Sequence, residues 1–95
     1  MNQETIQIST FRKNLRKECY AVRLKKKELI VTYHNQSLFK VINLFKSLTP
    51  PDHDCVECSV AIVRNKMTEF IELIEQHGAV ILISNGKRLV KCELI

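Results

Sequence analysis

The chain has 95 residues, of which 45% are hydrophobic and 26% charged, a composition typical of a soluble globular protein. Its apolar runs of four or five residues are far shorter than the roughly 20 residues that cross a bilayer. Met1–Glu4 also lacks the basic start and the apolar stretch of a signal peptide. We therefore expect no membrane association and a cytoplasmic protein in which the four cysteines stay reduced.

The formal net charge of +5 is divided unevenly along the chain. Residues 1–46 carry ten basic and three acidic side chains, whereas residues 47–95 carry five basic and seven acidic ones. We therefore expect the first half, and not the second, to attract a polyanion. A lysine-rich helix face that is merely solvated is the alternative interpretation.

The predicted elements of residues 6–32 recur in residues 58–84, at an offset of 52 residues. Each segment opens with apolar and polar residues in alternation, which is typical of a strand. A helix follows, with one apolar stripe at the spacing i, i+4, i+8 and i+11. The strand positions are Ile6 and Ile8, then Cys58, Val60 and Ile62. The stripes are Phe11, Leu15, Cys19 and Val22, then Val63, Met67, Ile71 and Ile74.

A buried strand and a hairpin complete each segment. The matched strands are Leu29–Thr32 with Ile81–Ser84, at an offset of 52, and Leu38–Lys40 with Leu89–Lys91, at an offset of 51. We place the one-residue difference in the turn, where the length of the chain varies easily. That turn is Asn85-Gly86 in the second segment, a strong hairpin signal, and the looser loop His34-Asn35-Gln36-Ser37 in the first.

Local signals mark the ends of the helices and the boundary between the segments. Ser9 or Thr10 is expected to cap the first helix, and Asn65 to act as a late cap of the second. Gly78 is expected to end the second helix in the left-handed conformation. Pro50-Pro51 indicates a connector, since neither proline can donate a backbone hydrogen bond.

These patterns predict an α+β fold of two tandem β-α-β-β units, which share a sheet or pack as a pseudo-dimer. The first, basic unit spans residues 1–46, a Pro-containing connector spans 47–57, and the second, acidic unit spans 58–95. Duplication explains the pattern. Convergence is the alternative, because Arg12 and Arg64 are the only identical pair in the strand–helix block.

Residues Ile6–Leu15 read Ile-Gln-Ile-Ser-Thr-Phe-Arg-Lys-Asn-Leu. With the spacing to Leu29–Thr32 and to the hairpin after it, this segment resembles the opening of Phd/YefM-type antitoxins, which have the prevent-host-death fold. That family typically starts with a strand, a serine cap and a helix bearing an arginine–polar–Asn–Leu segment. The resemblance covers residues 5–44 well. It is weaker over residues 58–95, a degenerate second copy in which Asn85–Val90 looks like the family's hairpin.

The resemblance implies an operator-binding repressor that pairs with a toxin, as a dimer of two chains or as a pseudo-dimer within one chain. It places Arg12 near the N-terminus of the first helix, where free N–H groups and the helix dipole attract phosphate. Arg12 can additionally read a guanine edge, and Arg16 and Lys17 would contact phosphates. The expected residues for binding double-stranded DNA are Ser9, Thr10, Arg12, Lys13, Asn14, Arg16 and Lys17, with Arg64 and Lys66 as a second, weaker arm.

Two features depart from the family. Tyr33 stands where an arginine is common, and the chain ends at Ile95 without the long acidic tail that such antitoxins wrap around a toxin. In the second unit, Glu69, Glu72 and Glu75 would repel phosphate if they faced DNA. We therefore expect the first unit to carry DNA binding and the second unit to serve assembly.

The sequence offers little for other chemistry. His53, Cys55 and Cys58 could supply three zinc ligands, but a structural site needs four, so we expect neither a metal nor a cofactor. With no nucleophile–base pair and only two glycines to build a substrate cradle, we expect no enzyme. The alternative functions are RNA binding and a protein-interaction module that inhibits a toxin or another partner without contacting DNA.

Overall fold

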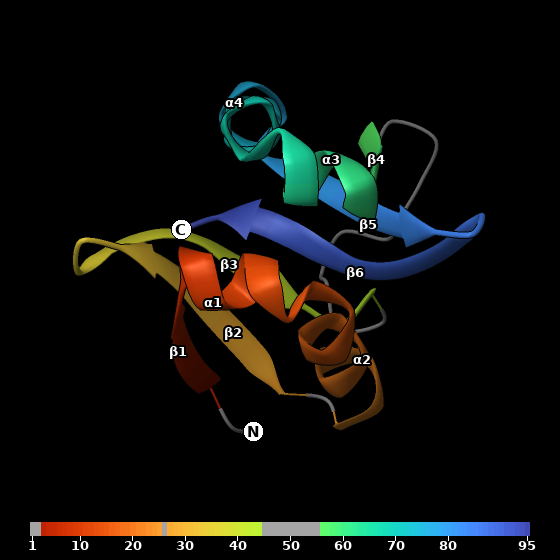
Figure 1. The fold of residues 1–95 in the computed structure, drawn as a ribbon, viewed down its shortest axis with the longest axis horizontal. Coiled ribbons are helices and arrows are strands. Elements are labelled where there is room, and N and C mark those ends of the chain that lie inside the picture. Colours follow the sequence, from red (N-terminus) through yellow and green to blue (C-terminus); the bar gives the residue numbers. More distant parts are fainter. Residues whose placement is uncertain (1–2, 26, 45–55) are drawn as a thin grey trace.

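The structure is a computed structural model that describes residues 3–25, 27–44 and 56–95. It is a mixed α/β fold in which this part of the chain forms one six-stranded sheet and four helices (Figure 1). The first half contains β1 (Gln3–Gln7), α1 (Ile8–Lys13), α2 (Leu15–Lys25), β2 (Glu28–Tyr33) and β3 (Gln36–Ile42). The second half contains β4 (Val56–Ser59), α3 (Val60–Asn65), α4 (Met67–His77), β5 (Ala79–Ser84) and β6 (Lys87–Leu94). The same order of elements therefore occurs twice.

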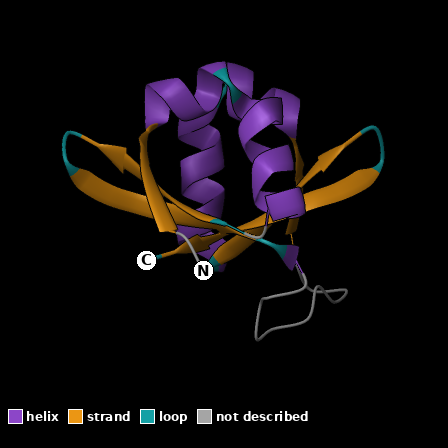
Figure 2. Ribbon diagram, turned by 90° about the horizontal axis from the view of Figure 1, so that it is seen from below, coloured by secondary structure: helices purple, strands orange, loops and turns teal. Residues whose placement is uncertain are grey.

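The sheet has the strand order β1-β2-β3-β6-β5-β4, so the two halves meet where β3 pairs with β6. Both outer pairs, β1 with β2 and β4 with β5, are parallel, and the other neighbours are antiparallel. At the centre Val41 lies opposite Cys92, and these residues occupy equivalent positions of the two halves. An approximate two-fold axis therefore passes between them. Figure 2 shows the result, with all helices on one face and one hairpin splaying outward on each side.

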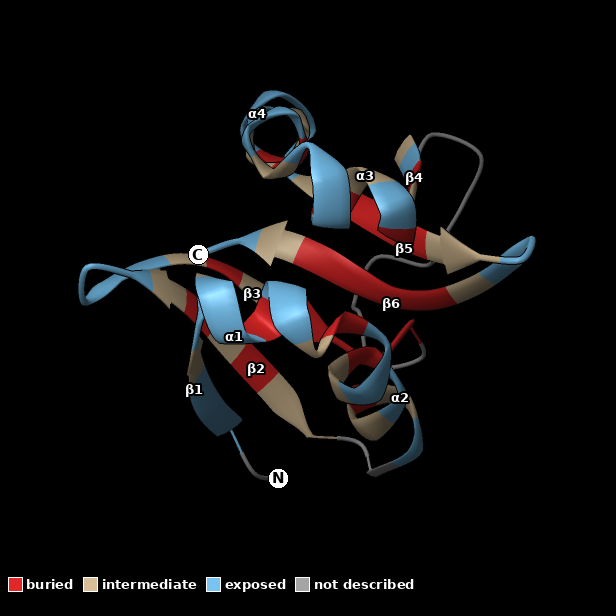
Figure 3. Cartoon of the chain, viewed as in Figure 1, coloured by how far each residue is buried: buried red, intermediate tan, exposed pale blue. Residues whose placement is uncertain are grey.

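The core lies between the sheet and the helices, where Figure 3 shows the buried segments of the central strands. The apolar stripe predicted for the first half is confirmed, because Phe11, Leu15, Cys19 and Val22 are all at most 1% exposed. The apolar stripe predicted for the second half is confirmed only in part. Val63 and Ile74 are buried as predicted, but Phe70 replaces Met67 and Ile71, which are only half-buried. Phe70 is drawn inward by edge-to-face contact with Phe39, whose ring centroid lies 5.6 Å away.

Both helical segments begin earlier than predicted. Ile8 and Val60 are the first residues of α1 and α3 rather than strand residues, and β4 begins at Val56, within the range predicted as connector. The N-cap residues are Gln7 and Ser59, which have extended backbone and no side-chain capping bond. The cap prediction for Ser9 and Thr10 is therefore wrong. The physical reason is that each strand runs straight into its helix, so these two residues lie inside the first helical turns.

The start and the end of α4 agree only in part with the predictions. Asn65 does not cap α4, because it ends α3 and the N-cap residue is Lys66, which makes no side-chain capping bond. The prediction for Gly78 is confirmed: its φ is 80°, and its N–H donates to the Ile74 carbonyl at 2.7 Å. A residue without Cβ adopts this left-handed conformation at little cost.

The two hairpins have the same tight geometry, so the looser loop predicted for the first half is wrong. His34 and Asn35 form a two-residue turn with φ of 49° and 64°, as Asn85 and Gly86 do with 52° and 77°. The one-residue difference instead lies between helix and strand. Residues 26–27 separate α2 from β2, whereas Gly78 alone separates α4 from β5. From β2 in the first half and β5 in the second, equivalent residues are therefore 51 positions apart in the sequence.

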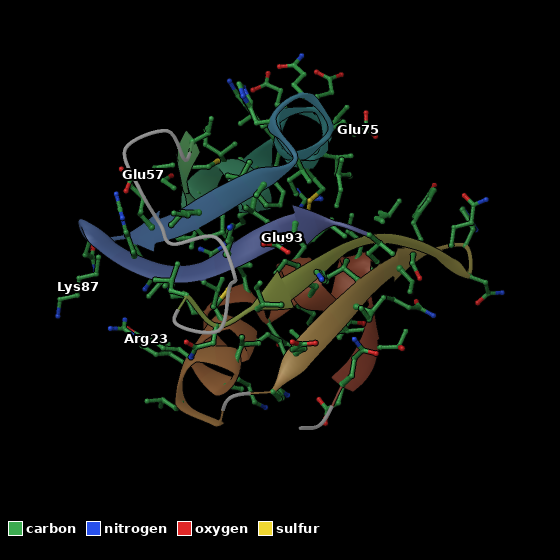
Figure 4. All side chains as sticks on the ribbon, turned by 180° about the vertical axis from the view of Figure 1, so that it is seen from behind. Arg23, Glu57, Glu75, Lys87 and Glu93 are labelled. Atoms are coloured by element: carbon green, nitrogen blue, oxygen red, sulfur yellow. The ribbon has the colours of Figure 1, made fainter. Side chains whose placement is uncertain are left out.

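The face of the sheet away from the helices carries a row of charges. Lys91 is only 2% exposed, and its Nζ lies 3.2 Å from Oε1 of Glu93. Lys40 Nζ lies 3.6 Å from the other carboxylate oxygen of Glu93, which Figure 4 labels near the middle of this face. The connector proper, including Pro50-Pro51, falls outside the described residues. None of the four helices is long and apolar enough to cross a membrane.

Candidate nucleic-acid interface

The predicted DNA-binding residues lie in and directly after α1, in the first turn of α2, and at the equivalent end of α3. The chain turns at Asn14, whose φ and ψ are −109° and 30°, and this turn splits the predicted first helix into α1 and α2. Arg12 and Lys13 therefore end α1 and directly precede the N-terminus of α2. The prediction that Arg12 and Lys13 lie near the N-terminus of the first helix is therefore wrong. The helix N-terminus next to them is that of α2.

Arg12 and Arg64 meet at the approximate two-fold axis. The Arg12 side-chain Nε donates to the backbone carbonyl oxygen of Arg64 at 2.5 Å. Ser9, Lys13 and Asn65 line the same hollow of about 370 Å³ together with the two arginines. The two arms that the sequence suggests are therefore adjacent parts of one surface. Asn65, predicted only as a cap, also belongs to this surface, since it follows Arg64 in the chain.

Arg16, in the first turn of α2, lies against the hairpin of the other half. It lines a hollow of about 300 Å³ with Ala61 of α3 and with Asn85 and Gly86 of the β5–β6 turn. This neighbourhood arises because α2 packs against β6 as well as β3. A residue from the first half thus shares a surface with a hairpin from the second.

Lys87 extends this surface and was missed by sequence reasoning. It is exposed at the start of β6, next to the turn, and Figure 4 labels it at the end of the hairpin. Lys87 pairs with Ser84, which lines the same hollow as Arg16, and the side chains of paired residues lie on the same face of a sheet. The Asn-Gly turn followed by two basic residues was the signal that could have identified it.

The equivalent hollow on the other side of the axis, of about 320 Å³, has a polar lining that includes Gln7, Ser9, Thr32, His34 and Asn35. Beside it lies a more apolar hollow of about 440 Å³, lined by Tyr33 and Leu38 of the β2–β3 hairpin, by Met67, Thr68 and Ile71 of α4, and by Arg12. Thr68 stands where α2 has Arg16, at the offset of 52. The two sides of the helical surface therefore have the same backbone plan and different chemistry.

The cations of this surface are uncompensated. Arg12, Lys13, Arg16, Lys17, Arg64 and Lys66 are all exposed, whereas Asn14 is half-buried. Within the described part of the chain, no carboxylate forms an ion pair with any of these six cations. Glu18, the acid in the first turn of α2, is turned to Lys27, whose Nζ lies 3.6 Å away. The unpaired charge therefore raises the local potential for an anion.

Lys27 and the cysteines belong to the scaffold. A hydrogen bond to Glu4, 2.8 Å long, raises the pKa of the Lys27 amine. Burial raises the pKa of Cys19 to about 12 and that of Cys92 well above its ordinary value, which keeps both thiols protonated and unreactive.

The described ranges 3–25, 27–44 and 56–95 contain no group of three histidine, cysteine, aspartate or glutamate residues placed to hold a metal ion. His53 and Cys55 of the predicted ligand set lie outside these ranges, and Cys58 is buried. Comparisons of this chain with known protein families, with curated proteins and with solved structures find no match.

Proposed function

We propose that this protein is a DNA-binding transcriptional repressor in which both halves are Phd/YefM-like units. The observation that carries the proposal is the hollow at the axis where Arg12 contacts Arg64, because its three exposed cations, Arg12, Lys13 and Arg64, form no ion pair within the described residues. In this proposal the two halves of one chain form the pseudo-dimer that lies on double-stranded DNA. The symmetric strand order and the repeated element order support this arrangement.

The DNA backbone would approach the first turns of α2 and α4. α2 and α4 lead into β2 and β5 at their C-terminal ends, and their N-termini follow α1 and α3 after a one-residue turn, on the helical side of the sheet (Figure 2). Free N–H groups and the positive end of the helix dipole attract phosphate there. Arg16 and Lys17 add phosphate contacts, which position the protein, and the Arg12 guanidinium can read a guanine edge. Its Nε bond to Arg64 would hold that guanidinium in place.

A protein-binding function is the second candidate. It is favoured by two exposed apolar side chains on successive turns of α2, Tyr20 at 49% and Leu24 at 74% exposure. Because these two residues are four positions apart, they lie on one side of the helix, away from the buried stripe. A toxin or another protein that inserts apolar side chains over this patch would use a surface separate from the α1–α3 face.

Titration with salt tests the DNA-binding proposal. The probe is a fluorescent 30-base-pair duplex from the region upstream of the protein's own gene, and anisotropy is measured between 50 and 300 mM NaCl. Binding is expected to weaken steeply with salt, because each phosphate contact contributes about −0.9 to the logarithmic slope. Arg12→Ala is expected to weaken binding by about 1–3 kcal/mol at fixed salt.

The matched control is Lys40→Gln, which removes one positive charge from the opposite face of the sheet. Circular dichroism verifies that both variants fold. Equal effects of the two variants, or affinity independent of salt, would contradict the proposal. Binding to a protein partner that is lost in Leu24→Lys, without any affinity for DNA, would support the second candidate instead.

A further inference from the structure

The topology joins elements of opposite halves on each side of the axis. The N-terminus of α2 shares a hollow with the β5–β6 turn, as Arg16 with Asn85 and Gly86 shows. The N-terminus of α4 shares a hollow with the β2–β3 hairpin, as Thr68 with Tyr33 shows. Each side of the surface therefore contains one helix of its own half and one hairpin of the other half.

This exchange concentrates charge on one side. On the first side Arg16 lines the shared hollow, Lys17 follows Arg16 in the first turn of α2, and Lys87 follows the turn at the start of β6; all three are exposed cations. We name this set the cationic flank. The equivalent residues of the second side are Thr68, Glu69 and Gln36, which we name the acidic flank; all three are exposed, and Glu69 is the one charged residue among them.

The centre between the flanks is balanced. Arg12 and Lys13 of the first half and Arg64 of the second line the hollow at the axis, and Lys66 lies two residues after Arg64, so each half has two exposed cations in this part of the chain. The helices continue the contrast away from the axis: Glu72 and Glu75 of α4 occupy the positions that Tyr20 and Arg23 occupy in α2. The backbone is nearly two-fold symmetric, and the electrostatic surface is not.

From this arrangement we infer that one chain recognises a non-palindromic DNA site in one fixed orientation. The inference rests on the proposed function and specifies its ligand. A symmetric dimer presents identical surfaces to two half-sites and therefore reads a palindrome. Here the cationic flank contacts the phosphates of one half-site, while the carboxylate of Glu69 repels the phosphates of the other. The protected DNA is accordingly longer on one side of the axis.

The experiment starts from a pool of 30-base-pair duplexes with a randomised centre. Selection on the wild-type chain is expected to enrich a motif without dyad symmetry, bound by one chain per duplex in sedimentation. Hydroxyl-radical cleavage of the enriched duplex is expected to show protection that extends further on one side.

Two charge-reversing substitutions, at the equivalent positions 17 and 69, then test which flank contacts which side of the DNA site. Glu69→Lys is expected to add protection on the short side, to steepen the salt slope by about one and to tighten binding about 5- to 10-fold at 0.1 M salt. Lys17→Glu is expected to remove protection on the long side and to weaken binding by at least the same factor. Both residues are exposed, so neither change disturbs the core.

The matched control is Glu28→Lys, which makes the same change of charge at the end of β2 remote from the turn, opposite Gln3. It is expected to leave the protection pattern unchanged. A palindromic motif with symmetric protection, or equal effects of Glu69→Lys and Glu28→Lys, would overturn the inference while leaving the proposed function intact. The absence of any enriched motif, together with no salt-dependent binding to any duplex of the pool, would overturn both.

Discussion

Phe39 is the side chain that joins the cores of the two halves. It lies on β3 with 1% of its surface exposed, and its ring packs edge-on against Phe11 of α1 at 6.0 Å and Phe70 of α4 at 5.6 Å between centroids. Because Phe11 belongs to the first half and Phe70 to the second, Phe39→Ala removes contacts on both sides at once. We expect it to destabilise the whole fold in a single step.

The expected loss follows from burial. Replacing a fully buried Phe with Ala costs about 3–5 kcal/mol, which includes the cavity that remains. Each edge-to-face contact contributes about 0.5–1.5 kcal/mol of this amount. A domain of this length is stable by about 5–14 kcal/mol, so the variant loses a large share of its free energy of unfolding.

Urea unfolding followed by circular dichroism measures this loss. With a slope of about 1.5 kcal/mol per molar urea, the midpoint is expected to fall by about 2–3 M. Tyr33→Ala, at a position that is 54% exposed, is the matched aromatic control and is expected to change stability by under about 0.5 kcal/mol. A loss below about 1 kcal/mol for Phe39→Ala, or two separate transitions in the variant, would refute the reasoning that one core unites the halves.

Four further predictions concern the hairpin turns and the buried thiols. Gly86→Ala is expected to lower the free energy of unfolding by about 1–2 kcal/mol, because its φ of 77° suits residues without Cβ. Asn35→Gly, at the equivalent position with φ of 64°, is expected to leave stability equal or higher; urea midpoints with the opposite order would contradict this. Because burial raises the pKa of Cys19 from 9.0 to about 12, its thiol ionises first in the unfolded chain. The contribution of the Cys19 thiol to the free energy of unfolding is therefore fully present below about pH 9 and is lost as pH rises toward 12. Iodoacetamide at pH 8 should leave Cys19 and Cys92 unmodified in the native protein, as peptide mass mapping would show, and rapid modification there would count against their burial.

Much of the architecture follows from local patterns in the sequence. Apolar spacing identified the buried face of α2 through Leu15, Cys19 and Val22, because a 3.6-residue period leaves one side of a helix apolar. Asn85-Gly86 and Gly78 identified a turn and a helix end, because few other residues accept a positive φ. These features depend on neighbours in the chain and were therefore predictable.

Packing decided the details that local patterns left open. Phe70 is buried in place of Ile71 because the ring of Phe39 lies beside α4, and that contact depends on a residue more than 30 positions away. His34-Asn35 forms a tight turn without glycine because the pairing of β2 with β3 brings the two strands to it in the required register. Where long-range pairing competes with a local preference, pairing prevails.

By itself, the sequence determined the amount and sign of charge in each half of the chain, the repeat, and the residues of a candidate interface around Arg12. Only the tertiary structure decided how these charges combine. Pairing of β3 with β6 places α2 beside the hairpin of the other half, so that Arg16 shares a hollow with the β5–β6 turn that Lys87 follows. The same pairing places Thr68, the residue before Glu69, beside Tyr33 and Leu38 of the β2–β3 hairpin. Charge along a chain is a property of sequence, whereas charge on a surface depends on which segments the fold brings together.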